Sequence, residues 1–324
     1  FSMEAPGSRV RQFIDERCVR GDRAVVLEPT DKGEMIVLKQ GRRSMQLAWT
    51  HLLPSTFNGA ARMNVANALA AAGAAFAAGA PLHDIRQGLR TFTTSYYLSP
   101  GRLNRIEVDH AEVFVDYCHN PAGLQLLGEF VDRYVAGKNK STRVQRTVVV
   151  GAAGDRRDQD IREMGELAAK WFDHVIIRED DNLRRRAPGE TAALVAEGAQ
   201  QAIDSGEARA ASVETVLDEL EATQVAIDSA RAGDLVVICA DKHARVMAAL
   251  EDLTHLATPG AHDLCAPSGS PSTTSSASAP RRSARSTRPP SAASPTDSAR
   301  AFTYDTICPP TSATSAAAAA TGSS

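Results

Sequence analysis

From about residue 105 onwards, short continuous runs of apolar residues alternate with segments of helical periodicity. The apolar runs stand in "VFVDY", "RTVVVGAAG", "DHVIIRED" and "GDLVVICADKH". Between the first two, Leu124, Leu127, Val131 and Tyr134 recur at helical spacing. Such alternation predicts βαβ units around a mostly parallel sheet. Because the runs are apolar throughout, we expect helices on both faces of that sheet, which is a doubly wound α/β fold.

The chain divides at two points in its sequence. Before residue 98, the segments 23–29 and 34–41 predict a β-hairpin, and a helix should run from about Arg62 to Ala78. After Leu256 the chain becomes rich in Ser, Thr, Ala, Pro and Arg and loses its large apolar residues. A segment of that composition cannot bury enough surface to order itself. We therefore expect domains over 1–98 and 99–257, and a disordered tail over 258–324.

Composition excludes several classes of protein. The 324 residues are 43% hydrophobic and 23% charged, which is ordinary for a globular protein. A net charge of −3 argues against a general nucleic-acid binder. No apolar stretch is long enough to span a membrane. The five cysteines are scattered and form no C-x-x-C pair, which argues against a disulfide framework or zinc site and indicates a cytoplasmic setting.

Four of the expected strands end in polar or glycine-rich loops. These loops are "DYCHNP", "GAAGDRRD", "REDDNLRRR" and "ADKH". In an open α/β sheet, ligands bind at the carboxyl ends of the strands, so the four loops should meet at one edge. Each loop also has a simpler explanation: Asp116 or Asn120 as a helix cap, the glycines as packing, the charge run and the Lys–His pair as exposed surface. The glycine loop fits neither the G-x-G-x-x-G dinucleotide fingerprint nor a P-loop.

Taken in order, these segments resemble the Mur ligase superfamily. The resemblance rests on "FNGAARMNVANALAAAGAAFAAG", "LSPGRLN", "VDYCHNP", "GAAGDRRDQDIREMG", "IREDDN" and "DLVVICADKH", and it covers roughly residues 1–257. Within that superfamily, the chain is most similar to the module that adds arginine to the aspartate side chains of a polyaspartate polymer. The resemblance implies the end of an ATPase central domain, followed by a Rossmann-like C-terminal domain. It also implies an ATP-dependent ligase that forms amide bonds through an acyl phosphate.

The resemblance assigns one group of residues to ATP. Asp116 matches a carboxylate that binds the ribose hydroxyls, and Arg102 matches an arginine that reaches the nucleotide. His119 stands in the Asp-Tyr-Ala-His pattern of the family, with a cysteine in place of the alanine. Asn64 and Asn67 match helix positions in the central domain.

A second group is assigned to the substrates, arginine and an aspartate-containing polymer. One part of it lies in the Gly-Asp-Arg-Asp loop and another at the Lys–His strand end. We also expect the three acids of "REDDN" to grip a guanidinium, since paired carboxylate oxygens match its planar fork. The group comprises Asp155, Arg156, Asp158, Glu179, Asp180, Asp181, Lys242 and His243.

The family's P-loop and its Mg²⁺ ligands have no counterpart in this sequence. We therefore assign no catalytic residue and no metal ligand here, and expect this segment to be inactive unless joined to the rest of a homo-oligomeric enzyme. Whether the amine is arginine or another amino acid stays open. Two other functions also stay open: a nicotinamide-dependent oxidoreductase, and a noncatalytic module that binds a small anionic ligand.

Overall fold

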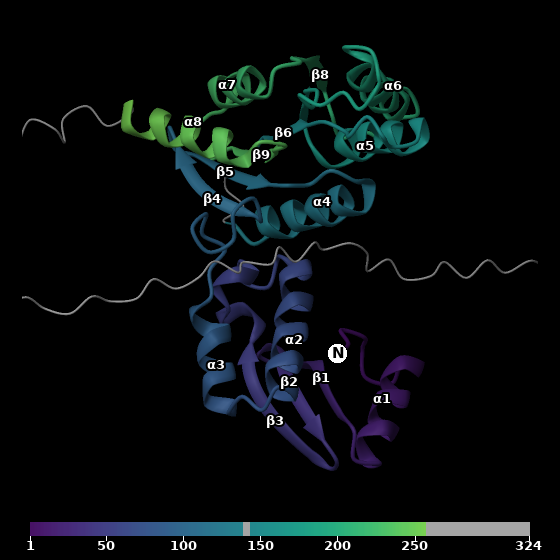
Figure 1. Ribbon diagram of the computed structural model, residues 1–324, viewed down its shortest axis with the longest axis vertical. Coiled ribbons are helices and arrows are strands. Elements are labelled where there is room, and N and C mark those ends of the chain that lie inside the picture. The colour runs from purple at the N-terminus through teal and green to yellow at the C-terminus, as the bar shows by residue number, and fades with distance from the viewer. Residues whose placement is uncertain (139–142, 257–324) are drawn as a thin grey trace, which may run out of the picture. The chain divides into compact units, whose positions relative to one another are not determined.

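A computed structural model describes residues 1–138 and 143–256 of the chain, and they form two β-sheets with flanking helices (Figure 1). One sheet lies before residue 98 and the other after it. The expected disorder of residues 258–324 lies outside the described residues.

The first sheet is antiparallel, with the strand order β1-β2-β3. The predicted hairpin is confirmed as β1 (Arg23–Thr30) and β2 (Gly33–Gln40), and β3 (Arg43–Trp49) extends it. Apolar side chains of one face pack under α2 (Arg62–Ala77) and α3 (Leu82–Thr91), whereas those of the other face meet α1 (Arg9–Val19). Two short 3-10 turns, Thr50–Leu52 and Pro54–Thr56, lead from β3 into α2.

The second sheet has six strands in the order β4-β5-β9-β6-β7-β8. Only β4 runs antiparallel to its neighbour, so the predicted mostly parallel sheet is confirmed. The strands are β4 (Asn104–Val108), β5 (Ala111–Asp116), β6 (Arg146–Val150), β7 (His174–Ile177), β8 (Ser212–Thr215) and β9 (Leu235–Cys239). The helices between and after them are α4 (Pro121–Ala136), α5 (Asp158–Trp171), α6 (Glu190–Asp204), α7 (Glu219–Ser229) and α8 (His243–Leu256).

The two faces of this sheet carry separate apolar cores. On one face, alternate residues such as Val148 and Val237 pack against α4, α5 and α6. On the other face, their neighbours Val149 and Val236 pack against α7 and α8. Successive side chains of a strand point to opposite faces, so a strand covered on both sides must be apolar throughout. The predicted doubly wound arrangement is therefore confirmed.

One predicted helix is wrong at its start. The sequence "VETVLDELEATQVAIDSA" predicts a helix from Val213, but Ser212–Thr215 forms β8 and α7 begins only at Glu219. Parallel pairing with β7 satisfies the backbone hydrogen bonds of β8, and this pairing outweighs the local preference for a helix. The helix starts where Asp218 caps it, accepting hydrogen bonds from the backbone N–H groups of Leu220 and Glu221, each 2.9 Å away.

Candidate functional site

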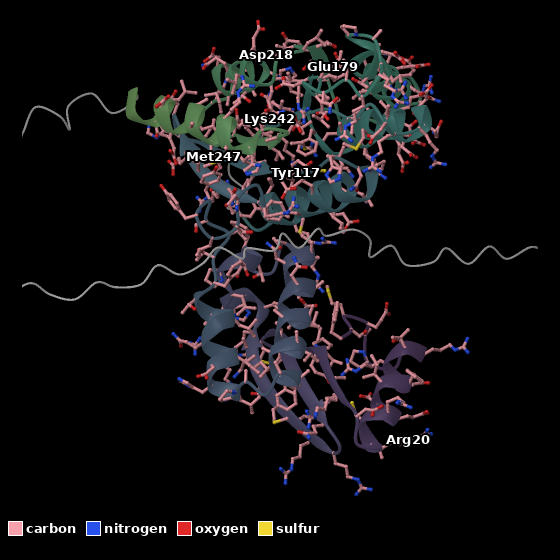
Figure 2. All side chains as sticks on the ribbon, viewed as in Figure 1. Arg20, Tyr117, Glu179, Asp218, Lys242 and Met247 are labelled. Carbon is pink, nitrogen blue, oxygen red and sulfur yellow. The ribbon has the colours of Figure 1, made fainter. Side chains whose placement is uncertain are left out.

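The loops after β5, β6, β7 and β9 together line a cavity of about 110 Å³. These strands are parallel neighbours, so their carboxyl ends lie at one edge of the sheet. Figure 2 labels Tyr117 after β5, Glu179 after β7 and Lys242 after β9. The lining residues are Tyr117, Cys118, His119, Ala153, Asp155, Arg156, Arg178, Asp180, Arg184, Ala240 and Asp241. Segments far apart in the sequence thus share one polar cavity.

In the loop after β5, the strand-end carboxylate and the cap of the next helix are two different residues. Asp116 ends the strand and accepts a hydrogen bond from the backbone N–H of Leu103 at 2.9 Å, so it caps no helix. The cap of α4 is Asn120, whose Oδ1 accepts from the N–H of Gly123 at 2.8 Å. His119 hydrogen-bonds the Tyr117 carbonyl through Nδ1 at 2.9 Å. The strand end therefore leaves Asp116 available for a role other than capping.

Two further features of this strand end bear on the residues assigned to ATP. The guanidinium of Arg102 lies over the ring of Tyr117, 5.3 Å from its centroid. Cys118 belongs to the apolar core beneath the cavity, and its proximity together with burial raises the pKa of the Cys239 thiol well above its ordinary value. Both cysteines are buried and act as packing residues, and Cys239 has little thiolate character.

Burial raises the pKa of the Asp116 carboxyl, and the Leu103 N–H and the charge of Arg102 oppose that rise only in part. A carboxyl whose pKa is higher in the folded than in the unfolded state stabilises the fold below its unfolded pKa of about 3.9, and that stabilisation is lost as pH rises through the folded pKa. We therefore expect Asp116→Asn to become more stable, relative to the parent protein, as pH rises from 4 to 7. Urea unfolding across this range measures the difference.

Asp158 supplies a control of opposite sign. Its exposed carboxylate pairs with Arg186, and this hydrogen bond lowers the pKa of Asp158. Asp158→Asn should therefore lose stability relative to the parent as pH rises, by a small amount because the pair is exposed. Two parallel pH profiles would contradict the role of burial at Asp116.

The glycines after β6 are explained by packing against protein. A Cβ on Gly151 would lie 2.9 Å from the guanidinium carbon of Arg178, and one on Gly154 would lie 2.4 Å from the carbonyl oxygen of Leu183. Both glycines thus allow the next loop to approach closely.

The loop after β6 also carries charged residues, and only some of them form ion pairs. Asp155 pairs with Arg184 at 2.7 Å, and Asp158 pairs with Arg186 at 2.7 Å. Arg156 also lines the cavity, yet its guanidinium makes no hydrogen bond or ion pair with any residue that the structure describes. A free guanidinium at a cavity wall is the group on this loop best able to meet an anion.

The three acids after β7 point to three different places. Glu179 is buried and accepts hydrogen bonds from the Gly189 N–H at 2.8 Å and the Thr191 hydroxyl at 2.5 Å, which ties it to the start of α6. Asp180 lines the cavity and pairs with Arg178. Asp181 lies between Lys242 at 3.5 Å and Arg245 at 3.4 Å. Only Asp180 of the three is a wall of the cavity.

The remaining predicted residues lie around the cavity or elsewhere. The Lys242 ammonium pairs with Asp241 at 3.1 Å. His243 is the first residue of α8, and its ring centroid lies 6.2 Å from that of Tyr96. Asn64 and Asn67 lie on α2, where the Asn64 amide donates to the Ser55 carbonyl at 2.7 Å. None of these four predicted residues lines the cavity.

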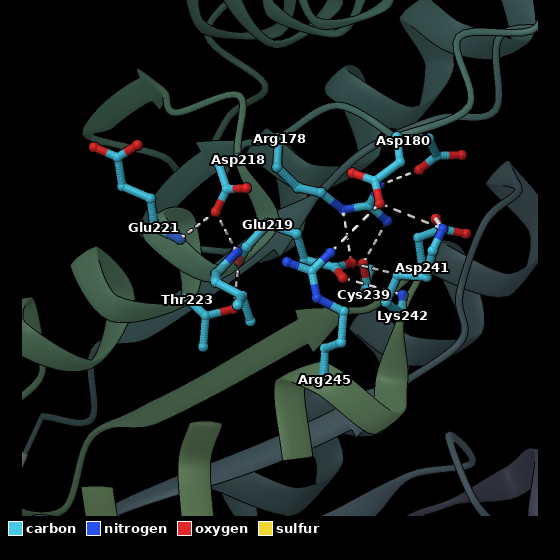
Figure 3. A network of polar contacts seen from close by, with 12 residues as sticks. Arg178, Asp180, Asp218, Glu219, Glu221, Thr223, Cys239, Asp241, Lys242 and Arg245 are labelled. Atoms are coloured by element: carbon cyan, nitrogen blue, oxygen red, sulfur yellow. Dashed lines mark hydrogen bonds and ion pairs between the residues drawn. The ribbon is translucent and has the colours of Figure 1, made fainter. Parts of the chain in front are cut away.

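Two residues central to the site were not predicted from the sequence. Arg178 is 3% exposed and Glu219 6% exposed, and they belong to one polar network (Figure 3) of which Arg178 also lines the cavity. The position of Arg178 directly after an apolar strand could have indicated a site residue, because a charge that is buried there needs polar partners. Nothing in the sequence distinguishes Glu219 from the other acids of its helix.

Residues 1–138 and 143–256 hold no group of three or more His, Cys, Asp or Glu side chains that could bind a metal ion. Within these same residues, none of the helices combines the length and the apolar character that crossing a membrane requires.

A family model described as "Mur ligase, glutamate ligase domain" matches residues 101–242. Cyanophycin synthetase of Crocosphaera subtropica is 41% identical over 203 residues, which are 63% of this chain and 22% of that protein. The cyanophycin synthetase of Trichormus variabilis is 36% identical over 247 residues, covering 76% of this chain and 25% of that protein. A solved structure of FolC of E. coli in complex with ADP has a TM-score of 0.50 at 19% identity, covering 71% of this chain and 46% of that one.

The matched region therefore spans about a quarter of the length of these cyanophycin synthetases. A peptidoglycan ligase is also related: the UDP-N-acetylmuramoyl-L-alanyl-D-glutamate–2,6-diaminopimelate ligase of Corynebacterium glutamicum is 34% identical over 194 residues, covering 59% of this chain and 33% of that protein. Family model and sequence relatives agree on one superfamily. Over residues 101–242, the chain carries a domain of the Mur ligase superfamily.

Proposed function

We propose that this chain is part of an ATP-dependent ligase that joins a carboxylate to the amino group of an amino acid. The cavity at the strand ends is where the amino acid is held. The observation that carries the proposal is the convergence of four strand-end loops on one polar cavity, with Arg156 at its wall and unpaired among the residues that the structure describes. Similarity to cyanophycin synthetases and to a peptidoglycan ligase supports the reaction class.

The chemistry of such a ligase suits this arrangement. ATP would supply the phosphoryl group that turns the acceptor carboxylate into a reactive acyl phosphate. The protein must then hold the amine in line with the activated carbon and exclude water, because positioning supplies much of the rate. Asp116 and Arg102 are proposed to face the nucleotide, together with His119. For Asn64 and Asn67, on the other sheet's helix, the role towards ATP stays a prediction. The described residues offer no cluster for Mg²⁺, so no step is assigned to the ion here.

The finer proposal is that the amino acid is arginine and the acceptor an aspartate side chain of a polymer. The charges of the cavity favour a zwitterion with a cationic tail. Arg156 is proposed to meet the α-carboxylate and Asp180 the cationic tail, because both residues line the cavity. For Asp155, Asp158, Asp181, Lys242 and His243, the role towards the substrates stays a prediction. Glu179 is held by α6 and is better explained as a residue that shapes the loop.

An oxidoreductase is not favoured. The glycine loop lacks the G-x-G-x-x-G fingerprint, and its Gly151 and Gly154 are explained by close contact with Arg178 and Leu183. The comparisons with known proteins also give ligases.

Replacing Arg156 tests the site directly in the complete protein that contains this chain. We expect Arg156→Ala to raise KM for arginine about 10- to 100-fold, since hydrogen bonds to charged groups contribute roughly 1.5–3 kcal/mol. KM for ATP should stay nearly unchanged. Initial rates of ATP-dependent amide formation, measured against each substrate in turn, give both constants.

The neighbouring arginine is the matched control. Arg157 is exposed and pairs with Asp160 at 2.6 Å, away from the cavity wall, so Arg157→Ala should leave both constants within about twofold. If Arg156→Ala instead raises KM for ATP, the residue faces the nucleotide. A complete protein that forms no amide bond with any amino acid would refute the proposed function.

A further inference from the structure

At the cavity wall, a buried guanidinium lies among the ends of three strands. Arg178 follows β7 directly, and its Nη2 donates to the Cys239 carbonyl at the end of β9 at 2.8 Å. Its Nη1 donates to Asp180, and its Nε lies 3.5 Å from Oε1 of Glu219 (Figure 3). On the side of β6, Gly151 leaves room for the same guanidinium. Arg178 thus sets the spacing of the strand ends from which the cavity loops depart.

Glu219 grips the loop that follows β9. It is the first residue of α7, and its buried carboxylate accepts a hydrogen bond from the Asp241 N–H at 2.6 Å and from the Lys242 N–H at 3.0 Å. Each oxygen holds one N–H group, so the carboxylate fixes two consecutive peptide units. The negative charge also lies at a helix N-terminus, where it is stabilised. A loop held in this way has little freedom to shift.

The position of Glu219 and its buried charge together imply a role in shaping the cavity wall. Asp241 and Asp180 are both walls of the cavity, and Glu219 reaches both without lining the cavity itself: the first through its N–H, the second through Arg178. Burying a carboxylate and a guanidinium is costly unless each is well partnered. A helix could be attached to the sheet more simply by apolar contacts, as the rest of α7 is.

We propose that Glu219 is a positioning residue of the ligase site: through two backbone N–H groups and through Arg178 it holds Asp241 and Asp180 in the cavity wall. The inference rests on the proposed function, and it adds a residue that does not touch substrate. Removing the carboxylate should let the loop after β9 move, and a displacement of about 1 Å can lower a rate about 100-fold.

The substitution Glu219→Gln tests this with little change of shape. Its amide keeps one acceptor but turns a donor towards an N–H group or towards Arg178. In the complete protein we expect kcat for amide formation to fall about 10- to 100-fold, with KM for ATP within about threefold. In this chain, amide exchange of Asp241 and Lys242 should speed up at least about tenfold while the strands stay protected.

Glu221 provides the matched control. It lies in the same first turn of α7, is exposed, and takes part in the helix start only through its backbone N–H, which Asp218 caps at 2.9 Å. Glu221→Gln removes the same charge near the same helix end. We expect it to leave kcat and both exchange rates within about twofold.

The two measurements separate the possible failures. Unchanged amide exchange in Glu219→Gln would overturn the inference whatever the protein catalyses. Faster exchange with kcat retained would show a purely structural role and overturn it as well. If the unaltered complete protein forms no amide bond, the proposed function fails and a role in a ligase site fails with it, while the exchange result still decides whether Glu219 holds the loop.

Discussion

Replacement of Gly165 by alanine is expected to destabilise the protein by about 3 kcal/mol or more. Gly165 lies in α5 where that helix crosses α6, and a Cβ there would lie 1.9 Å from the carbonyl oxygen of Val195. The opposing atom is backbone, so no side-chain rotation can relieve the clash and the helices must separate. Overpacking of this kind typically costs about 1–3 kcal/mol and more when backbones collide. Urea unfolding followed by circular dichroism measures the loss.

Gly88 is the control for the same substitution. It lies in α3, is exposed, and has nothing within 4 Å of the position of an added Cβ. Gly88→Ala should therefore stabilise its helix by about 0.5–1 kcal/mol, because alanine loses less backbone freedom on folding. If Gly165→Ala is no more harmful than Gly88→Ala, the close approach of α5 and α6 is not required.

Replacement of Arg178 by methionine is expected to cost about 3–5 kcal/mol of unfolding free energy. Methionine fills much of the same volume but leaves Asp180 and Glu219 without the cation that lies between them. The Cys239 carbonyl loses its donor as well. Removing one partner of a buried ion pair is costly because the remaining charge stays away from water. Denaturant unfolding at pH 7 gives the value.

A second arginine of the cavity wall shows what an exposed pair contributes. Arg184 is 43% exposed in its side chain and pairs with Asp155 at 2.7 Å. Arg184→Met should cost less than about 1 kcal/mol, since exposed ion pairs contribute little. Equal losses at Arg178 and Arg184 would contradict the importance of burial for the network around Arg178.

The arrangement of the second sheet could be predicted from sequence because its causes are local and periodic. Runs such as the one ending at Val150 are apolar at every position, which only a strand covered on both faces requires. Polar residues directly after those runs must lie at one sheet edge once the strands are parallel. That rule predicts His119, Arg156 and Asp180 at one sheet edge, and all three line the cavity.

Where the sequence prediction failed, long-range contacts had outweighed local preference. The region from Val213 looks helical, yet pairing with β7 makes its first residues a strand. The helix α1 was not predicted, because it is polar along most of its length and buries few residues. Its sequence therefore lacks the apolar periodicity from which a helix is inferred.

What the sequence by itself determined is the alternation of buried strands and helices after residue 105 and the edge at which the polar loops gather. Only the tertiary structure decided the partner of each charge. Glu179 and Asp180 are neighbours in the chain, yet one holds α6 and the other pairs with Arg178 at the cavity wall. Glu219 enters the site from a helix with no polar strand end of its own. Local patterns record whether a residue is buried, whereas the partner of a buried charge depends on which elements pack beside it.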